Sequence, residues 1–196
     1  MIKIDRERFD SDEELWFAHW CEELKLEGYI KHWSHEGLKI ELTPDVFIPW
    51  QKKMKTKVKI EERKLLQGSS YMPDFFIEWS EKADGLFCWE EMGTYENNPY
   101  KMLFSVNGVS IVEIKPSFDQ NNMTRLVRDR IKQAYTQGYF VNLVKSPDYF
   151  KDSFTPERYF YTPSGNSLRK KKGEVLYHSD KWPSLSDFLT ARSGQK

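Results

Sequence analysis

The chain has 196 residues, of which 39% are hydrophobic, 31% charged and 15% aromatic. This composition is typical of one globular domain with a sizeable core and excludes disorder over most of the length. The formal net charge is zero, so bulk charge does not announce a nucleic-acid binder, although a local basic surface would suffice. Two cysteines make no disulfide framework, and no signal-peptide or transmembrane pattern is present, so we expect a cytoplasmic protein without a membrane partner.

The first predicted element is a helix from about Ser11 to Glu27. Ser11 and Glu14 have the spacing of a capping box, and Gly28 follows where the helical pattern stops. Residues 29–44 are then expected to be extended.

Residues 45–70 are strongly charged with a trace of alternation, which indicates an exposed loop or a solvent-edge hairpin. Three strands are expected after this segment, at residues 73–80, 102–106 and 109–115. Asn107-Gly108 is a strong turn signal, so residues 102–115 are predicted to form a hairpin.

A second helix is predicted over residues 121–138, with Gly138 at its end. Its expected apolar face consists of Leu126, Val127, Ile131, Ala134 and Tyr135. A core strand at residues 139–146 and a short helix near residues 184–192 complete the reading. The order helix, strands, helix, strand predicts a mixed α/β domain.

Strand alternation separates core positions from site positions in two of these strands. The expected core positions are Phe75, Ile77, Trp79, Val112 and Ile114. Asp74, Glu113 and Lys115 lie on the opposite faces, so they would converge if the two strands are neighbours. Two carboxylates can hold Mg²⁺ or Mn²⁺, and a lysine beside them can position a water for phosphodiester hydrolysis.

Pro73-Asp74, followed by Glu113-Ile114-Lys115 and preceded by the acidic "SDEE" helix, resembles the PD-(D/E)xK nuclease superfamily. The resemblance covers roughly residues 10–145. It implies a restriction-endonuclease-like core, a mixed central β-sheet flanked by helices in the order α-β-β-β-α-β. The core would span residues 1–150, with insertions near 45–70 and 80–100. Residues 151–196 would be a C-terminal extension packed on the same domain.

The resemblance also implies a Mg²⁺-dependent DNA endonuclease in which a metal-activated water attacks the phosphorus directly. Asp74, Glu113 and the Ile114 carbonyl would bind the metal, and Lys115 would orient or activate the water. Glu14, or alternatively Glu13, would complete the acidic site as a further metal ligand from the first helix. Mn²⁺ would substitute for Mg²⁺. The small size suggests a resolvase-like, transposase-like or other phage-type enzyme, acting in the host cytoplasm if phage-encoded.

Three features depart from the motif or compete with it. The 39 positions between Asp74 and Glu113 exceed the spacing in compact members of the superfamily. Asp45, which also follows a proline, is an alternative to Asp74 as the first acid. His32 and His35 have an H-x-x-H spacing, but neither cysteine completes a zinc ligand pattern.

Nucleic-acid contacts are expected from the second helix and from a basic stretch near the C-terminus, where a solvated helix face and an exposed turn are the alternatives. The residues concerned are Arg125, Arg128, Lys132, Gln133, Lys170, Lys171 and Lys172. The basic run from Lys52 to Lys59 is a further candidate, with an exposed turn as the alternative. A homodimer or a larger nucleoprotein assembly would suit cleavage of two strands. The rival function is a non-catalytic nucleic-acid-binding or assembly protein on the same fold, and RNA is an alternative substrate.

Overall fold

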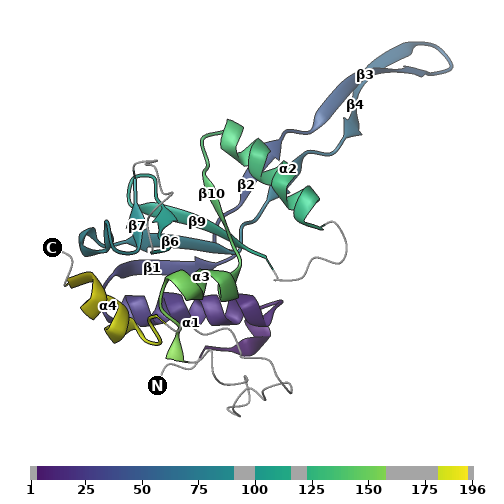
Figure 1. The fold of residues 1–196 in the computed structure, drawn as a ribbon. Coiled ribbons are helices and arrows are strands. Elements are labelled where there is room, and N and C mark those ends of the chain that lie inside the picture. Colours follow the sequence, from purple (N-terminus) through teal and green to yellow (C-terminus); the bar gives the residue numbers. More distant parts are fainter. Residues whose placement is uncertain (1–3, 91–99, 116–122, 158–180, 194–196) are drawn as a thin grey trace.

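A computed structural model describes residues 4–90, 100–115, 123–157 and 181–193. Its centre is a four-stranded mixed sheet (Figure 1) with the order β1 (Ile30–His35), β6 (Phe75–Trp79), β9 (Val109–Ile114) and β10 (Val141–Val144). The strands β1, β6 and β9 pair antiparallel, whereas β9 and β10 are parallel. Helix α2 (Met123–Thr136) provides the crossover that two parallel strands require. The predicted mixed α/β class is confirmed.

Helix α1 (Asp12–Leu26) covers one face of this sheet, below β1 in Figure 1. It begins where predicted, because the Ser11 hydroxyl caps it by accepting a hydrogen bond from the Glu14 backbone N–H at 3.2 Å. Phe17, Trp20 and Leu24 are fully buried and belong to the large core cluster that also contains the inner face of β6 and β9. Helices α3 (Ser146–Asp152) and α4 (Leu185–Ser193) contribute to the same cluster.

A smaller core lies on the other face of the sheet, beneath α2 and a two-stranded ladder of β2 (Ile40–Thr43) and β5 (Ser69–Tyr71). Its buried members are Ile40, Leu42, Tyr71, Ile111, Ala134 and Val141. Two residues of the predicted apolar face of α2, Leu126 and Tyr135, are exposed, so that part of the prediction is wrong. Of the predicted apolar face, only Val127, Ile131 and Ala134 are buried or partly buried. They form a narrow stripe along the helix at positions i, i+4 and i+7.

The hairpin predicted over residues 102–115 forms its turn but not its ladder. Asn107 and Gly108 have φ of 53° and 73°, as a tight turn requires. However, β8 (Leu103–Phe104) pairs in parallel with β7 (Cys88–Trp89). The bridge between Val106 and Val109, next to the turn, is the one backbone pairing between this segment and β9 in the described residues. The reason is that the Asn142 side-chain amide binds both the N–H and the carbonyl of Phe104, each at 2.9 Å.

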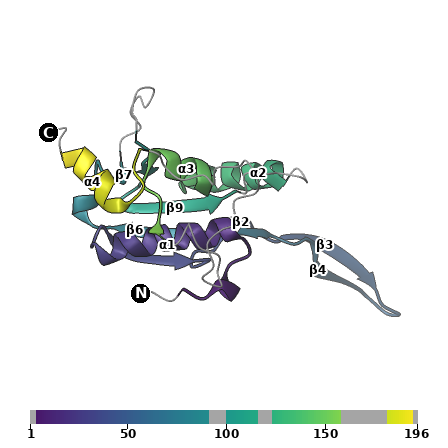
Figure 2. The same cartoon turned by 60° about the horizontal axis from the view of Figure 1, so that its bottom comes forward.

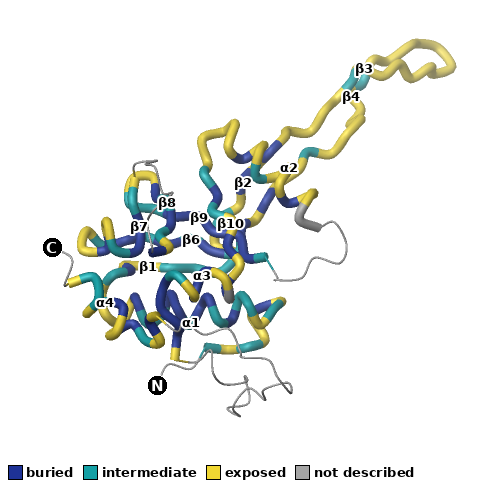
Figure 3. Tube along the Cα trace, viewed as in Figure 1, coloured by how far each residue is buried: buried dark blue, intermediate teal, exposed yellow. Residues whose placement is uncertain are grey.

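Strands β3 (Val46–Lys53) and β4 (Val58–Leu66) form a long antiparallel ribbon that projects from the body of the molecule (Figures 1 and 2). We refer to residues 46–66 as the arm. Nearly all of its length is exposed (Figure 3), and neither core cluster includes an arm residue. Of the two alternatives for residues 45–70, an exposed loop or a hairpin, the structure shows the hairpin, over residues 46–66.

Two short 3₁₀ helices, Arg6–Arg8 and Glu81–Ala83, complete the described elements. Helix α4 packs into the large core cluster, since Phe188 stacks against Phe87 with ring centroids 5.3 Å apart. No helix in the described ranges is both long enough and apolar enough to cross a membrane.

Candidate functional site

Asp74 and Glu113 lie opposite each other at one end of the central sheet. In the β6–β9 ladder Phe75 is the partner of Val112, so the next position along the two antiparallel chains places Asp74 across from Glu113. The backbone N–H of Ile114 donates to Asp74 Oδ2 at 2.6 Å and fixes this carboxylate against β9. The two acids are thus brought together although 39 positions separate them in the chain.

Glu113 is buried and has a partner for each carboxylate oxygen. Lys115 Nζ donates to Oε1 at 2.7 Å, and the Tyr71 hydroxyl donates to Oε2 at 2.7 Å. The side chains of Glu113 and Lys115 are only 7% and 13% exposed. Because a buried charge is stable only when it is paired and hydrogen-bonded, Glu113, Lys115 and Tyr71 form an interdependent unit.

Asp74 lies in an environment that disfavours its ionised form. Burial and the charge of Glu113 raise its pKa to about 7, against an ordinary value of 3.8, and the charge of Glu14 acts in the same direction. The Ile114 N–H and the Lys115 ammonium lower the pKa of Asp74 but do not compensate. Among the described side chains of the site, the carboxylates carry more charge than the Lys115 ammonium neutralises, which is the condition that favours a bound cation.

Glu14 enters the site from the first turn of α1. Its Oε1 accepts from the Ser11 hydroxyl at 2.8 Å, and its Oε2 accepts from the Asp10 backbone N–H and lies 3.2 Å from His35 Nε2. Burial alone would raise the pKa of Glu14, but the hydrogen bonds from His35 and Ser11 outweigh burial and lower it. Glu14, and not Glu13, is the helix carboxylate whose charge acts on Asp74.

The residues that hold the acids, His35 and Tyr71, were not predicted as site residues. His35 ends β1, and its ring packs between Phe9 and Phe75, with centroids 4.7 and 5.3 Å away. Strand alternation places His32 and His35 on opposite faces of β1, so the H-x-x-H spacing does not form a ligand pair. For Tyr71 the sequence offers only its position three residues before Asp74.

The competing acid Asp45 has a structural role at the base of the arm. Its carboxylate accepts from the Gly68 backbone N–H at 2.6 Å and pairs with Lys64 at 2.5 Å. A side chain at position 68 would collide with the Thr43 carbonyl, since an added Cβ would lie 2.5 Å from that oxygen. Asp45 and Gly68 therefore hold the two chain segments together at the base of the arm.

The residues of the second helix that are predicted to contact nucleic acid are exposed on α2, as such a surface requires. They are the basic residues Arg125, Arg128 and Lys132 and the neutral Gln133. Lys132 has an exposed neighbour of opposite charge, Asp129, at 3.7 Å, an arrangement that contributes little to stability. The predicted contacts at Lys170, Lys171 and Lys172 lie outside the described residues.

Within the described ranges, no group of three or more His, Cys, Asp or Glu side chains is arranged to hold a metal ion. Mg²⁺ is commonly bound through only one or two carboxylates, with water and substrate phosphate completing its shell. Asp74 and Glu113 supply two such carboxylates in register, and their excess negative charge fits a divalent cation. The Ile114 backbone N–H faces Asp74, while a role for its carbonyl stays a prediction.

Comparison with known proteins adds no relative: no family model matches the chain, and no curated protein and no solved structure matches it significantly. The function is therefore inferred from the chemistry of the site.

Proposed function

We propose that this protein is a metal-dependent DNA endonuclease of the PD-(D/E)xK type, which hydrolyses phosphodiester bonds. The observation that carries the proposal is the juxtaposition of Asp74 and Glu113 across the β6–β9 ladder, with the Lys115 ammonium 2.7 Å from Glu113. The order α1, β1, β6, β9, α2, β10 of the core elements supports a restriction-endonuclease-like core. Glu14, at the start of α1, adds the acid expected from the first core helix.

Asp74 and Glu113 would hold the cation, and Glu14 would add negative charge beside them. When bound, Mg²⁺ would lower the pKa of a coordinated water and offset charge on the phosphate oxygens. Mn²⁺ would act in the same way, because both ions prefer oxygen ligands.

Among the described residues, Lys115 is the cation that is best placed for the attacking water. Its ammonium is largely buried against Glu113 and so keeps a fixed position at the end of β9. From there it would orient the water and stabilise negative charge that develops on phosphate. Tyr71 and His35 are positioning residues, since each one holds an acid and neither is required to touch the substrate.

One observation favours the non-catalytic alternative, a nucleic-acid-binding or assembly protein on the same fold. Both oxygens of Glu113 are engaged by Lys115 and Tyr71, which is also how a purely structural buried acid is satisfied. Under that alternative, Lys115 would stabilise the sheet and take no part in chemistry.

The deciding experiment incubates the full chain with supercoiled plasmid, linear duplex, single-stranded DNA, branched DNA and structured RNA. Each substrate is tested in Mg²⁺, in Mn²⁺ and in EDTA. The proposal expects cleavage of at least one DNA substrate in either metal and none in EDTA. The absence of metal-dependent cleavage from the whole panel would refute it, and cleavage of RNA alone would replace the assigned substrate.

A further inference from the structure

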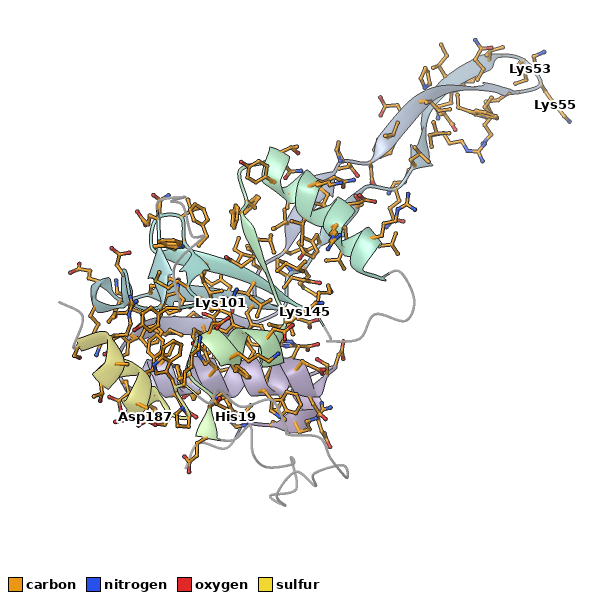
Figure 4. The ribbon with its side chains drawn as sticks, in the orientation of Figure 1. His19, Lys53, Lys55, Lys101, Lys145 and Asp187 are labelled. Carbon is orange, nitrogen blue, oxygen red and sulfur yellow. The ribbon has the colours of Figure 1, made fainter. Side chains whose placement is uncertain are left out.

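The arm concentrates positive charge in a chain that has no net charge. Residues 46–66 contain seven basic residues and two acidic ones, a formal charge of +5. The remaining residues therefore sum to −5. The basic residues of the arm are Lys52, Lys53, Lys55, Lys57, Lys59, Arg63 and Lys64. Five of these seven surround the tip, and Figure 4 shows Lys53 and Lys55 there, remote from Lys101 and Lys145 on the body.

The arm has features that are expected of an unoccupied binding surface. No third strand of the described chain pairs with β3 or β4, and a two-stranded ribbon alone is only marginally stable in water. Phe47 and Ile60 are 51% and 69% exposed. Lys52 and Lys59 are directly opposite each other in the ladder, an unfavourable pairing of like charges that the ion pair from Lys59 to Glu61 relieves only in part.

Trp50 and Phe47 on β3 are each associated with a cation of β4. The Arg63 guanidinium lies 4.7 Å from the centroid of the Trp50 ring, and Lys64 Nζ lies 5.9 Å from that of Phe47. Each face of the ribbon thus carries one aromatic ring beside a cation, and charged side chains interrupt the apolar ones along both faces. Such a surface suits a polyanion better than a hydrophobic protein partner.

The arm is also joined to the candidate site at its base. It is inserted between β1, which ends at His35, and β6, which follows Asp74. Its return strand continues into β5, whose last residue, Tyr71, donates a hydrogen bond to Glu113. The base of the arm is therefore continuous along the chain with the segment that positions the Glu113 carboxylate.

We propose that the arm binds duplex DNA by placing its two-stranded ribbon in the major groove, with the tip lysines against the phosphates. The major groove admits a β-ribbon of this kind, and eight residues of β3 extend about 26 Å along it. The role of the arm in holding a substrate rests on the proposed function, whereas DNA binding by the arm stands without it. The deep, narrow major groove of duplex RNA would not admit the ribbon.

The test is a binding measurement made with the full chain carrying Asp74→Asn, in EDTA, so that cleavage does not interfere. The probe is a fluorescent 30-base-pair DNA duplex titrated at several salt concentrations. The arm variant replaces Lys52, Lys53, Lys55 and Lys57 with Gln. The matched control replaces four exposed lysines of the body, namely Lys25, Lys31, Lys101 and Lys181.

We expect the arm variant to bind at least about tenfold more weakly, because each phosphate contact contributes about 0.9 to the log–log salt slope. Loss of four contacts would reduce that slope by up to about 3.6, whereas the control should bind as the parent does. Equal affinity of the arm variant and its control would overturn the inference. Equal binding of a duplex RNA of the same sequence would also overturn it.

Sedimentation velocity on the same proteins tests the alternative that the arm binds a second copy of the chain. If the parent is a dimer that the arm substitutions dissociate while DNA affinity stays unchanged, the arm is a protein interface and the inference fails. Arm-dependent DNA binding by a protein that cleaves nothing in Mg²⁺ or Mn²⁺ would instead support the inference and refute the proposed function.

Discussion

The carboxylate of Asp74 is held where its negative charge is unfavourable. Its pKa of about 7 means that the folded chain retains a proton that the unfolded chain releases near pH 4. In the absence of metal, the free energy of unfolding should therefore fall as the pH rises from 4 to 7 and stay low above that range. Under the proposed function, catalysis and stability make opposite demands on this residue.

Asp74→Asn should therefore be more stable than the parent at pH 8 in EDTA, by about 1 to 4 kcal/mol, and show no such gain at pH 4. The asparagine carbonyl still accepts the Ile114 N–H, so the fold is kept. Urea unfolding followed by circular dichroism at the two pH values measures the difference. Glu78→Gln, on the same strand, is the control and should show no comparable pH-dependent gain. A parent more stable than Asp74→Asn at pH 8 would contradict this account.

The Tyr71 hydroxyl stabilises the buried carboxylate of Glu113. Tyr71→Phe keeps the ring in the smaller core but leaves one oxygen of Glu113 without its donor. We expect the free energy of unfolding to fall by about 1 to 3 kcal/mol, as for other buried polar groups that lose a partner. Chemical denaturation measures the change, and Tyr139→Phe, at an exposed position, should be neutral. Equal losses in the two variants would show that the hydrogen bond to Glu113 is unimportant.

At the scale of the elements, we expect the body to fold without the arm. Because no arm residue belongs to either core cluster, replacing residues 48–63 with an Asn-Gly turn between Phe47 and Lys64 should leave the body folded. The shortened chain retains the ion pair between Asp45 and Lys64 at the base of the arm. We expect its thermal midpoint to lie within a few degrees of the parent value by circular dichroism. Loss of the cooperative transition would show that the arm supports the core.

Local sequence patterns predicted the elements that are determined by local chemistry. The Ser11 cap, the turn at Asn107-Gly108 and the alternation in β6 are examples. The patterns failed where a distant side chain decides the outcome. The Asn142 side-chain amide hydrogen-bonds to the backbone of Phe104, which lies 38 positions earlier in the chain. These bonds take the place of the expected hairpin ladder. The exposure of Leu126 likewise follows from how α2 lies over the sheet, which helical periodicity alone does not show.

At the scale of the whole molecule, the sequence predicted which acids meet but not what holds them. Asp74 and Glu113 were predictable because alternation and neighbouring strands are sufficient to bring them together. Tyr71 and His35 were not, since their roles depend on how β5 approaches β9 and how β1 approaches α1. The basic run at Lys52–Lys59 was visible in the sequence, but its position on a ribbon that projects from the body was not.

The most direct test of the central claim is the rate at which site variants cleave whichever DNA substrate the parent cuts, in Mg²⁺ and at saturating protein. Asp74→Asn and Lys115→Ala should each be slower by at least about 100-fold, because under the proposed function each removes a group that acts in the transition state. Glu78→Gln and Lys101→Ala, matched changes outside the site, should cleave at the parent rate. Cleavage by Asp74→Asn or Lys115→Ala at the parent rate would contradict the assignment of this site.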